Sequence, residues 1–437
     1  MGKTIGKRIL TALLLAVFWL LSAVPAQAEE LTLASQAAIL MDADTGQILY
    51  EKNAHLQLYP ASITKIMTAM LALQELEPDQ VLTVSPSAVG AVPVTSSHIS
   101  LKAGEQLTVE QALYAIATMS ANDAANVLAE AVSGSLPDFA IRMTDTARSL
   151  GAMDTNFTNA NGLPDSSHYT TAYDMALITA AALKVPGLAE YFRTTEYLLS
   201  PTNLSDARVF SNKDRLLPGG QYYYEGVLMA KTGWTSSAQG TFAAVVRRGD
   251  TTLIVIALKS PLLEDKYRDT WTLMDYGFSR YAKVFFTGEE LAEHFSLGKY
   301  EAVEGQEFAW QIPAEADPAK LTFSLGGETQ LLENRQRVVT VQASIGDSVL
   351  TQWQLVLEKP LLARDVIPEL PSVSGEEEQP EPEPEAPDRS ALLLAVPVCI
   401  VLLLLAMVRI RKIRRRRLRR SRLQARIRHM KRQIGNP

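Results

Sequence analysis

The chain has 437 residues, enough for two or three domains, and its formal net charge is −6. The charge is unevenly spread, because 14 of the 42 Lys plus Arg residues lie in residues 409–437 and 3 lie in residues 1–28. The part between them carries 25 basic against 48 acidic side chains, a balance of −23, which excludes nucleic acid and anionic lipid as its expected partners.

Cysteine and histidine, two common metal ligands, are sparse in this chain. The only cysteine is Cys399, so the chain has no cysteine pair for a disulfide and no cysteine-based metal site. The histidines show no metal-ligand spacing; they are His55, His98, His168, His294 and His429. We therefore expect no metal and no cofactor.

The first 28 residues have the layout of a secretory signal peptide. Three basic residues precede an apolar run from Ile9 to Val24, and Ala26 and Ala28 frame a small-x-small sequence, "AQA". This pattern predicts cleavage after Ala28 and export of the chain from residue 29 onward. An uncleaved membrane anchor is the alternative.

Residues 29–284 alternate between strand and helix patterns. "AAILMDADTGQILYEKN" predicts two strands around a "DADTG" turn, and "TFAAVVRRGDTTLIVIALK" predicts a hairpin whose turn contains "RGD". Between them, "SITKIMTAMLALQEL" and "TVEQALYAIATM" carry the apolar spacing of helices. We expect an α/β (α+β) domain whose sheet combines the two ends of this segment.

The predicted helix after residue 59 begins with a serine and a lysine three residues apart. Ser62 and Lys65 would lie one turn apart on the same face. A serine hydroxyl is a weak nucleophile that needs an adjacent base, and a lysine can be that base only when its amine is neutral. Burial and a second cation both lower a lysine pKa. The spacing alone is unspecific, because Ser296 and Lys299 repeat it.

Two further motifs come later in the chain. "SAN" places Ser120 two residues before Asn122, and "KTG" begins at Lys231. A K-T-G triplet is expected by chance in about one such chain in ten. Taken singly, each residue is more often a helix cap, a turn residue or a solvated charge. The ordered set S-x-x-K, S-x-N and K-T-G marks serine acyl-transfer enzymes, with Lys231 as the second cation.

Residues 285–366 change to short alternating segments separated by turns. "EFAWQIP", "KLTFSLG", "RVVTVQAS" and "TQWQLVLE" predict a small all-β domain. Residues 367–389 are rich in Pro and Glu and predict an extended linker.

The chain ends in a predicted membrane span and a basic tail. Residues 390–408 contain an uncharged run from Ala391 to Val408, long enough for one transmembrane helix. Residues 409–437 contain no acidic residue, and basic residues beside a span mark its cytoplasmic side. A nucleic-acid-binding arm is the alternative for this tail, but its position favours contact with anionic lipid.

Around the three motifs the sequence resembles the low-molecular-mass penicillin-binding proteins of the D-alanyl-D-alanine carboxypeptidase type. The resemblance covers about residues 35–284. The similar segments include "SHISLKAGEQLTVEQALYAIATMSANDAANVLAE", "TNFTNANGLP", "HYTTAYDMALIT", "SNKDRLL" and "AKTGWT". The chain departs from that family in having a true span with a basic tail, and Ala rather than Gly before the Lys of K-T-G.

The resemblance implies a β-lactamase/transpeptidase-like fold and a serine D-Ala-D-Ala carboxypeptidase. Ser62 would attack the penultimate D-Ala carbonyl of a peptidoglycan stem peptide, with its own N–H and that of Trp234 facing the oxyanion. Ser120 would relay a proton to the leaving amine and Asn122 would donate to the substrate amide. The expected site residues are Ser62, Lys65, Ser120, Asn122 and Lys231 for catalysis, and Thr232, Gly233, Trp234, Thr235 and Lys213 for substrate binding.

The expected partners are peptidoglycan stem peptides, β-lactam antibiotics as covalent inhibitors, and the cytoplasmic membrane, with no nucleic acid. The expected location is the cell membrane, with the catalytic domain outside and the C-terminus in the cytoplasm. Two alternatives are a β-lactamase and a non-hydrolytic penicillin-binding membrane sensor. No G-x-S-x-G surrounds Ser62, which argues against an α/β-hydrolase.

Overall fold

The structure is a computed structural model that describes residues 31–295, 297, 301–331, 336–345 and 348–358. The predicted signal peptide, linker, span and basic tail lie outside the described residues. Within those ranges, no helix is both long enough and apolar enough to cross a bilayer.

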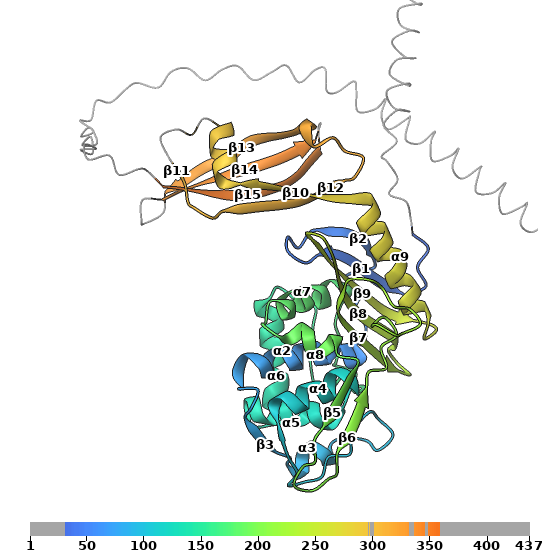
Figure 1. Cartoon of the computed structure of the whole chain (residues 1–437). Coiled ribbons are helices and arrows are strands. Elements are labelled where there is room, and N and C mark those ends of the chain that lie inside the picture. Colours follow the sequence, from blue (N-terminus) through green and yellow to red (C-terminus); the bar gives the residue numbers. More distant parts are fainter. Residues whose placement is uncertain (1–30, 296, 298–300, 332–335, 346–347, 359–437) are drawn as a thin grey trace, which may run out of the picture. The chain divides into compact units, whose positions relative to one another are not determined.

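A five-stranded antiparallel sheet forms the centre of the region up to residue 280 (Figure 1). Its strands are β1 (Ala37–Asp42), β2 (Ile48–Lys52), β7 (Val227–Thr235), β8 (Gln239–Arg248) and β9 (Thr251–Ser260). The strand order is β2-β1-β9-β8-β7, and Leu40 of β1 pairs with Val255 of β9. The sheet therefore joins the two ends of the segment, which confirms the sequence prediction.

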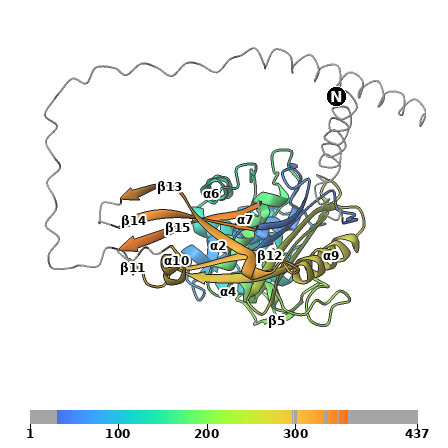
Figure 2. The same ribbon diagram turned by 90° about the horizontal axis from the view of Figure 1, so that it is seen from above.

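Both faces of this sheet are covered by helices. Along β9, Ile254 and Ile256 pack into a core with most of the helices, whereas Leu253 and Val255 face α9 (Asp265–Arg280) on the other side. Figure 2 shows α9 on one side of the sheet and α2, α6 and α7 on the other. The continuous apolar run of β9 follows from this double burial, because successive strand residues point to opposite faces.

The helices of the larger core form one layer that carries the first two motifs. This layer consists of the 3₁₀ turn η1 (Ala61–Thr64), α2 (Lys65–Glu75), α3 (Pro86–Gly90), α4 (Val109–Thr118), α5 (Asn122–Ser133), α6 (Leu136–Ser149), α7 (Ala172–Leu183) and α8 (Leu188–Arg193). Two small two-stranded sheets flank it: β3 (Val81–Thr83) with β4 (Gln106–Thr108), and β5 (Glu196–Leu199) with β6 (Arg208–Ser211).

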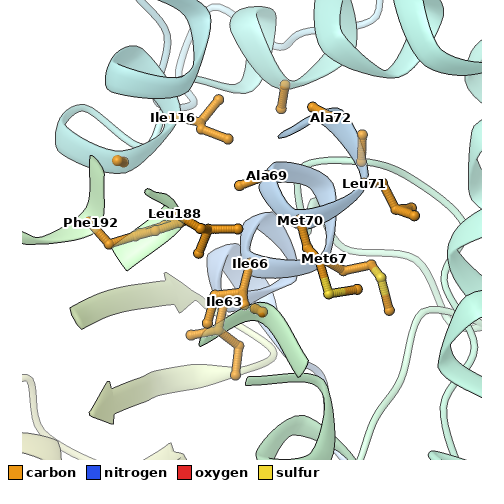
Figure 3. Close-up of a cluster of buried hydrophobic side chains, with 14 of the residues drawn as sticks. Ile63, Ile66, Met67, Ala69, Met70, Leu71, Ala72, Ile116, Leu188 and Phe192 are labelled. Carbon is orange, nitrogen blue, oxygen red and sulfur yellow. The ribbon is translucent and has the colours of Figure 1, made fainter. Parts of the chain in front are cut away.

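Helix α2 is buried over its first eight residues. Ile66 and Ala69 lie on the side of α2 that faces Leu188 of α8, whereas Met67 and Met70 lie on the other side of the helix (Figure 3). Burial of such side chains contributes about 1.5–3 kcal/mol each. The apolar packing therefore holds the N-terminal end of α2, and with it the Ser62 turn, against the sheet.

The region after α9 is a separate small core. Its elements are β10 (Tyr281–Thr287), α10 (Gly288–His294), β11 (Glu301–Ala302), β12 (Glu307–Pro313), the 3₁₀ turn η2 (Pro318–Lys320), β13 (Leu321–Leu331), β14 (Arg337–Ile345) and β15 (Ser348–Glu358). Strand β10 pairs with β12, and the other strands form a sheet in the order β11-β15-β14-β13.

The prediction of an all-β domain after residue 285 is correct only in part. The four predicted strands are present, but Leu291 and Ala292 of helix α10 share the core with Val341 and Leu355. Thr287 and Glu290 form a capping box at the start of this helix. The capping box explains why residues 288–294 form a helix and not a strand. Strand β10 also runs across the boundary that the sequence placed between residues 284 and 285.

Candidate active site

Ser62 lies in the 3₁₀ turn that leads into α2. Ala61 before it has a left-handed φ of 48°, and a Cβ built on Gly162 would lie 1.9 Å from the carbonyl oxygen of Ala61. The loop at residue 162 can approach the serine turn this closely only with glycine, since no side chain fits there. Ser62 is thus held between α2 and that loop.

A buried histidine supports the same turn. The N–H of Thr158 donates to Nδ1 of His168 at 3.0 Å, so Nε2 carries the ring proton and donates to Thr64 Oγ1 at 2.9 Å. Burial lowers the pKa of His168 to about 4. The ring is therefore neutral at physiological pH and keeps this hydrogen-bond direction.

Lys65 has no exposed surface and reaches three polar partners. Its Nζ lies 3.2 Å from Ser62 Oγ, 2.7 Å from Asn122 Oδ1 and 2.6 Å from the carbonyl oxygen of Asn161. Burial holds the pKa of Lys65 well below its ordinary value; the charge of Lys231 lowers it further, and Asp123 opposes both.

The hydrogen-bonding groups of a neutral lysine amine match these three partners in number. It has two N–H donors, which the oxygens of Asn122 and Asn161 accept, and one lone pair, which is left for the hydroxyl proton of Ser62. The lowered pKa of Lys65 and the 3.2 Å distance from its Nζ to Ser62 Oγ together indicate a base aimed at its nucleophile.

The S-x-N and K-T-G motifs meet on the opposite side of Ser62. Lys231 Nζ donates to Ser120 Oγ at 3.0 Å and to the carbonyl oxygen of Thr232 at 2.9 Å. Ser120 has a left-handed φ of 57°, a strained conformation for a serine that is typical of functional sites. Burial lowers the pKa of Lys231 to about 8; Asp214 opposes this shift and Lys266 adds to it.

The glycine of K-T-G marks a close approach between the sheet and the serine turn. A Cβ on Gly233 would lie 2.3 Å from Thr241 Oγ1 and 2.8 Å from the backbone nitrogen of Ser62. Thr241 Oγ1 in turn donates to the carbonyl oxygen of Pro60 at 2.8 Å. Strand β7 thus runs directly beside the Ser62 N–H, the position expected for an oxyanion site.

These groups surround a pocket of about 400 Å³. The predicted site residues that line it are Ser62, Ser120, Lys213, Lys231, Thr232, Gly233 and Trp234. Lys65 and Asn122 are buried behind the serine. Thr235 is not part of the lining, and its Oγ1 accepts the N–H of Ala238 at 3.0 Å in the turn between β7 and β8.

The sequence interpretation missed three residues of this site. Lys266 of α9 donates to Thr232 Oγ1, and burial lowers its pKa to about 8. Asp214 forms part of the pocket wall, and Asn161 supplies one of the acceptors for Lys65. No short motif surrounds Lys266, which reaches the pocket from α9, the helix that follows β9.

Within the described ranges, no three His, Asp or Glu side chains gather as a metal site requires.

Comparison with known families identifies the chain. The model of the D-alanyl-D-alanine carboxypeptidase family matches residues 24–261. The D-alanyl-D-alanine carboxypeptidase DacF of Bacillus subtilis is 33% identical over 285 residues, which are 63% of this chain and 72% of the relative. The D-alanyl-D-alanine carboxypeptidase DacB2 of Mycobacterium tuberculosis is 31% identical over 56% of this chain and 82% of its own length.

Solved structures share the fold. Penicillin binding protein 5 from Haemophilus influenzae superposes with a TM-score of 0.65 at 22% identity, covering 75% of this chain and 98% of that protein. The D-alanyl-D-alanine carboxypeptidase from M. tuberculosis H37Rv gives a TM-score of 0.53 at 27% identity, covering 58% of this chain and 94% of that one. With its family model matched over more than half its length, the chain belongs to the D-alanyl-D-alanine carboxypeptidase family.

Proposed function

We propose that this protein is a serine-type D-Ala-D-Ala carboxypeptidase that removes the terminal D-alanine from peptidoglycan stem pentapeptides. The observation that carries the proposal is the fully buried Lys65 amine, whose pKa is lowered by burial and whose Nζ lies 3.2 Å from Ser62 Oγ. The same nucleophile would open the ring of a β-lactam and stay acylated, which makes such drugs covalent inhibitors.

The first half of the reaction forms an acyl-enzyme. Lys65 takes the hydroxyl proton of Ser62 as Oγ attacks the penultimate D-Ala carbonyl carbon. The backbone N–H groups of Ser62 and Trp234 stabilise the oxyanion. The proton taken up by Lys65 reaches the nitrogen of the departing D-alanine through the hydroxyl of Ser120, which is hydrogen-bonded to Lys231, as the C–N bond breaks, so Lys65 is neutral again.

The second half returns the free enzyme. A water molecule attacks the ester carbonyl carbon and gives a proton to Lys65, which passes it to Oγ of Ser62 as the ester C–O bond breaks and the shortened peptide is released. Asn122 donates to the substrate amide during both halves. Its Nδ2 is bound to Ser96 Oγ at 3.0 Å, a contact that orients the amide group.

The terminal carboxylate of the substrate is bound by the cationic side of the pocket. Lys231 and Lys266 are both buried there, and Lys266 donates to the hydroxyl of Thr232. Lys213 is exposed at the pocket wall and adds positive charge at the entrance. Thr235 remains a weaker candidate, because its hydroxyl is engaged in the neighbouring turn.

We expect Ser62→Ala to abolish both D-alanine release and covalent labelling by a fluorescent penicillin while the fold persists. Release is measured by mass spectrometry of a pentapeptide digest and labelling by gel fluorescence. Circular dichroism of the variant controls for folding. Labelling that persists without Ser62 would contradict the acyl-enzyme assignment, and rapid hydrolysis of the penicillin without D-alanine release would indicate a β-lactamase.

The KM for a carboxylate-ended peptide should rise several-fold as the pH increases from 7 to 9.5. The pKa values of Lys231 and Lys266 are both lowered to about 8, mainly by burial, so their positive charge is present below pH 8 and is lost above it. Initial-rate kinetics at fixed ionic strength give KM separately from kcat. A KM that stays constant to pH 9.5 would show that these lysines do not bind the carboxylate.

We also propose that residues 390–408 anchor the protein in the cytoplasmic membrane with the catalytic domain outside. The supporting facts are the uncharged run of this segment, the basic residues 409–437 after it, and the signal-like first 28 residues. The basic tail would also contact anionic lipid, at about 1 kcal/mol per residue near the surface.

Protease added outside intact wall-less cells should digest the catalytic domain and leave a tag placed after Pro437 protected. Immunoblots for the tag and for the catalytic domain give the result, and detergent-lysed cells serve as the control in which both are cleaved. Cleavage of the tag with protection of the domain would reverse the orientation.

A further inference from the structure

Asp214 is a buried carboxylate of the pocket wall that the proposed mechanism does not use. It lies between β6 and β7 and is 5% exposed. Its Oδ1 accepts the N–H of Leu216 at 3.0 Å, and its own N–H donates to Asn212 Oδ1 at 3.0 Å. Its Oδ2 is buried and has no hydrogen-bond partner among the described residues. One oxygen is therefore fixed by the backbone, and the other is free to hold a proton.

The titratable groups that face Asp214 from other elements lie on β7 and α9. Lys231 of β7 and Lys266 of α9 are 2% and 3% exposed, and the negative charge of Asp214 raises the pKa of each against the effect of burial. Tyr267 of α9 also faces it, and the charge of Asp214 helps to raise the pKa of its phenol.

The charges beside Asp214 in its own loop are directed elsewhere. Arg215 NH1 lies 3.4 Å from Glu264 Oε1, and Lys213 is exposed. Asp214 is thus the negative charge that faces the two buried lysines from this side of the pocket. Burial raises the pKa of Asp214 to about 6, against the effects of the Leu216 N–H and the two lysines.

A substrate carboxylate adds a second negative charge to the same small pocket. Two carboxylates that share a site cannot both stay ionised at low cost, so one of them gains a proton. A peptide α-carboxyl has a pKa of about 3.5, well below that of a buried aspartate, so the proton goes to the aspartate. The free Oδ2 provides the position for it.

We infer that Asp214 is the internal counter-ion of Lys231 and Lys266 in the empty pocket and takes up one proton from solvent when the substrate carboxylate binds. The inference rests on the proposed function, since it uses the carboxylate-binding role of the two lysines. No bond to the substrate forms: the aspartate becomes a neutral carboxylic acid, and the substrate carboxylate replaces it as the partner of the lysines. Asp214 is therefore a positioning residue, which couples the affinity for a free C-terminus to pH.

The direction of the pH effect is set by this exchange. Above pH 6 the empty pocket must gain a proton to bind substrate, so binding weakens as the pH rises. With a pKa of about 6 in the empty pocket, KM should fall about tenfold between pH 7 and pH 5. The lysines do not titrate in this interval, because their pKa values lie near 8.

Proton uptake during binding tests the inference directly. The full-length protein with Ser62→Ala binds a diacetylated Lys-D-Ala-D-Ala peptide without turnover, and calorimetry at pH 6.5 in two buffers of different ionisation enthalpy counts the protons. We expect uptake of more than half a proton, since most of Asp214 is ionised at that pH. Asp214→Asn in the same background should reduce the count to near zero, and Glu264→Gln should leave it unchanged.

A count near zero without the Asp214 substitution, or the same count in Asp214→Asn, would overturn the inference. If Asp214→Asn does not fold, the peptide with an amidated C-terminus replaces it, and equal uptake with the amide would be the contradicting result. KM between pH 5 and 7 in the enzyme with Ser62 intact gives a second readout, which should be flat in Asp214→Asn. Proton uptake without D-alanine release at any pH would contradict the proposed function instead, so the two failures are distinguishable.

Discussion

The site depends on one electrostatic constraint: a lysine amine with no contact to water must stay uncharged beside a serine. Lys65 is fully enclosed, and its two N–H groups are taken by fixed acceptors. Burial disfavours the charged form of an amine, and the nearby charge of Lys231 acts in the same direction. The only lone pair of the amine is then available to Ser62. Without this desolvation the serine would have no base.

The fold keeps water from Lys65 by joining segments that are far apart in the chain. The apolar face of α2 packs against α4 and α8, the start of α5 supplies Asn122, and the loop at Gly162 closes against the serine turn. Strand β7 brings Lys231 to the other side, and Gly233 lets that strand approach the Ser62 nitrogen. A side chain at position 162 would push the loop away from the serine turn, and one at position 233 would push β7 away from it.

Much of this arrangement was predictable from the sequence, because it depends on local patterns. The helix period placed Ser62 and Lys65 on one face, and two apolar runs around the "RGD" turn predicted the hairpin of β8 and β9. The three motifs predicted which side chains would meet around the serine, and the structure brings Ser62, Ser120 and Lys231 to one pocket. Thr235 was expected there too, but the turn after β7 engages its hydroxyl.

The remaining features depend on tertiary contacts that no local pattern records. Lys266 and Asp214 enter the pocket from α9 and from a loop, and each becomes informative only when its buried neighbours are known. Helix α10 is different, since the Thr287–Glu290 capping box is visible in the sequence and was overlooked among strand-like segments.

The base role of Lys65 is tested most directly by titrating its amine in the folded protein. NMR of ¹³C-labelled lysine side chains reports each pKa, and the signal that is missing in Lys65→Met gives the assignment. We predict that Lys65 titrates well below the ordinary lysine value of about 10.4, and that Lys231→Gln raises its pKa, since a neighbouring positive charge is removed. A Lys65 amine that remains charged up to its ordinary pKa, with or without Lys231, would contradict the claim that burial makes it the base for Ser62.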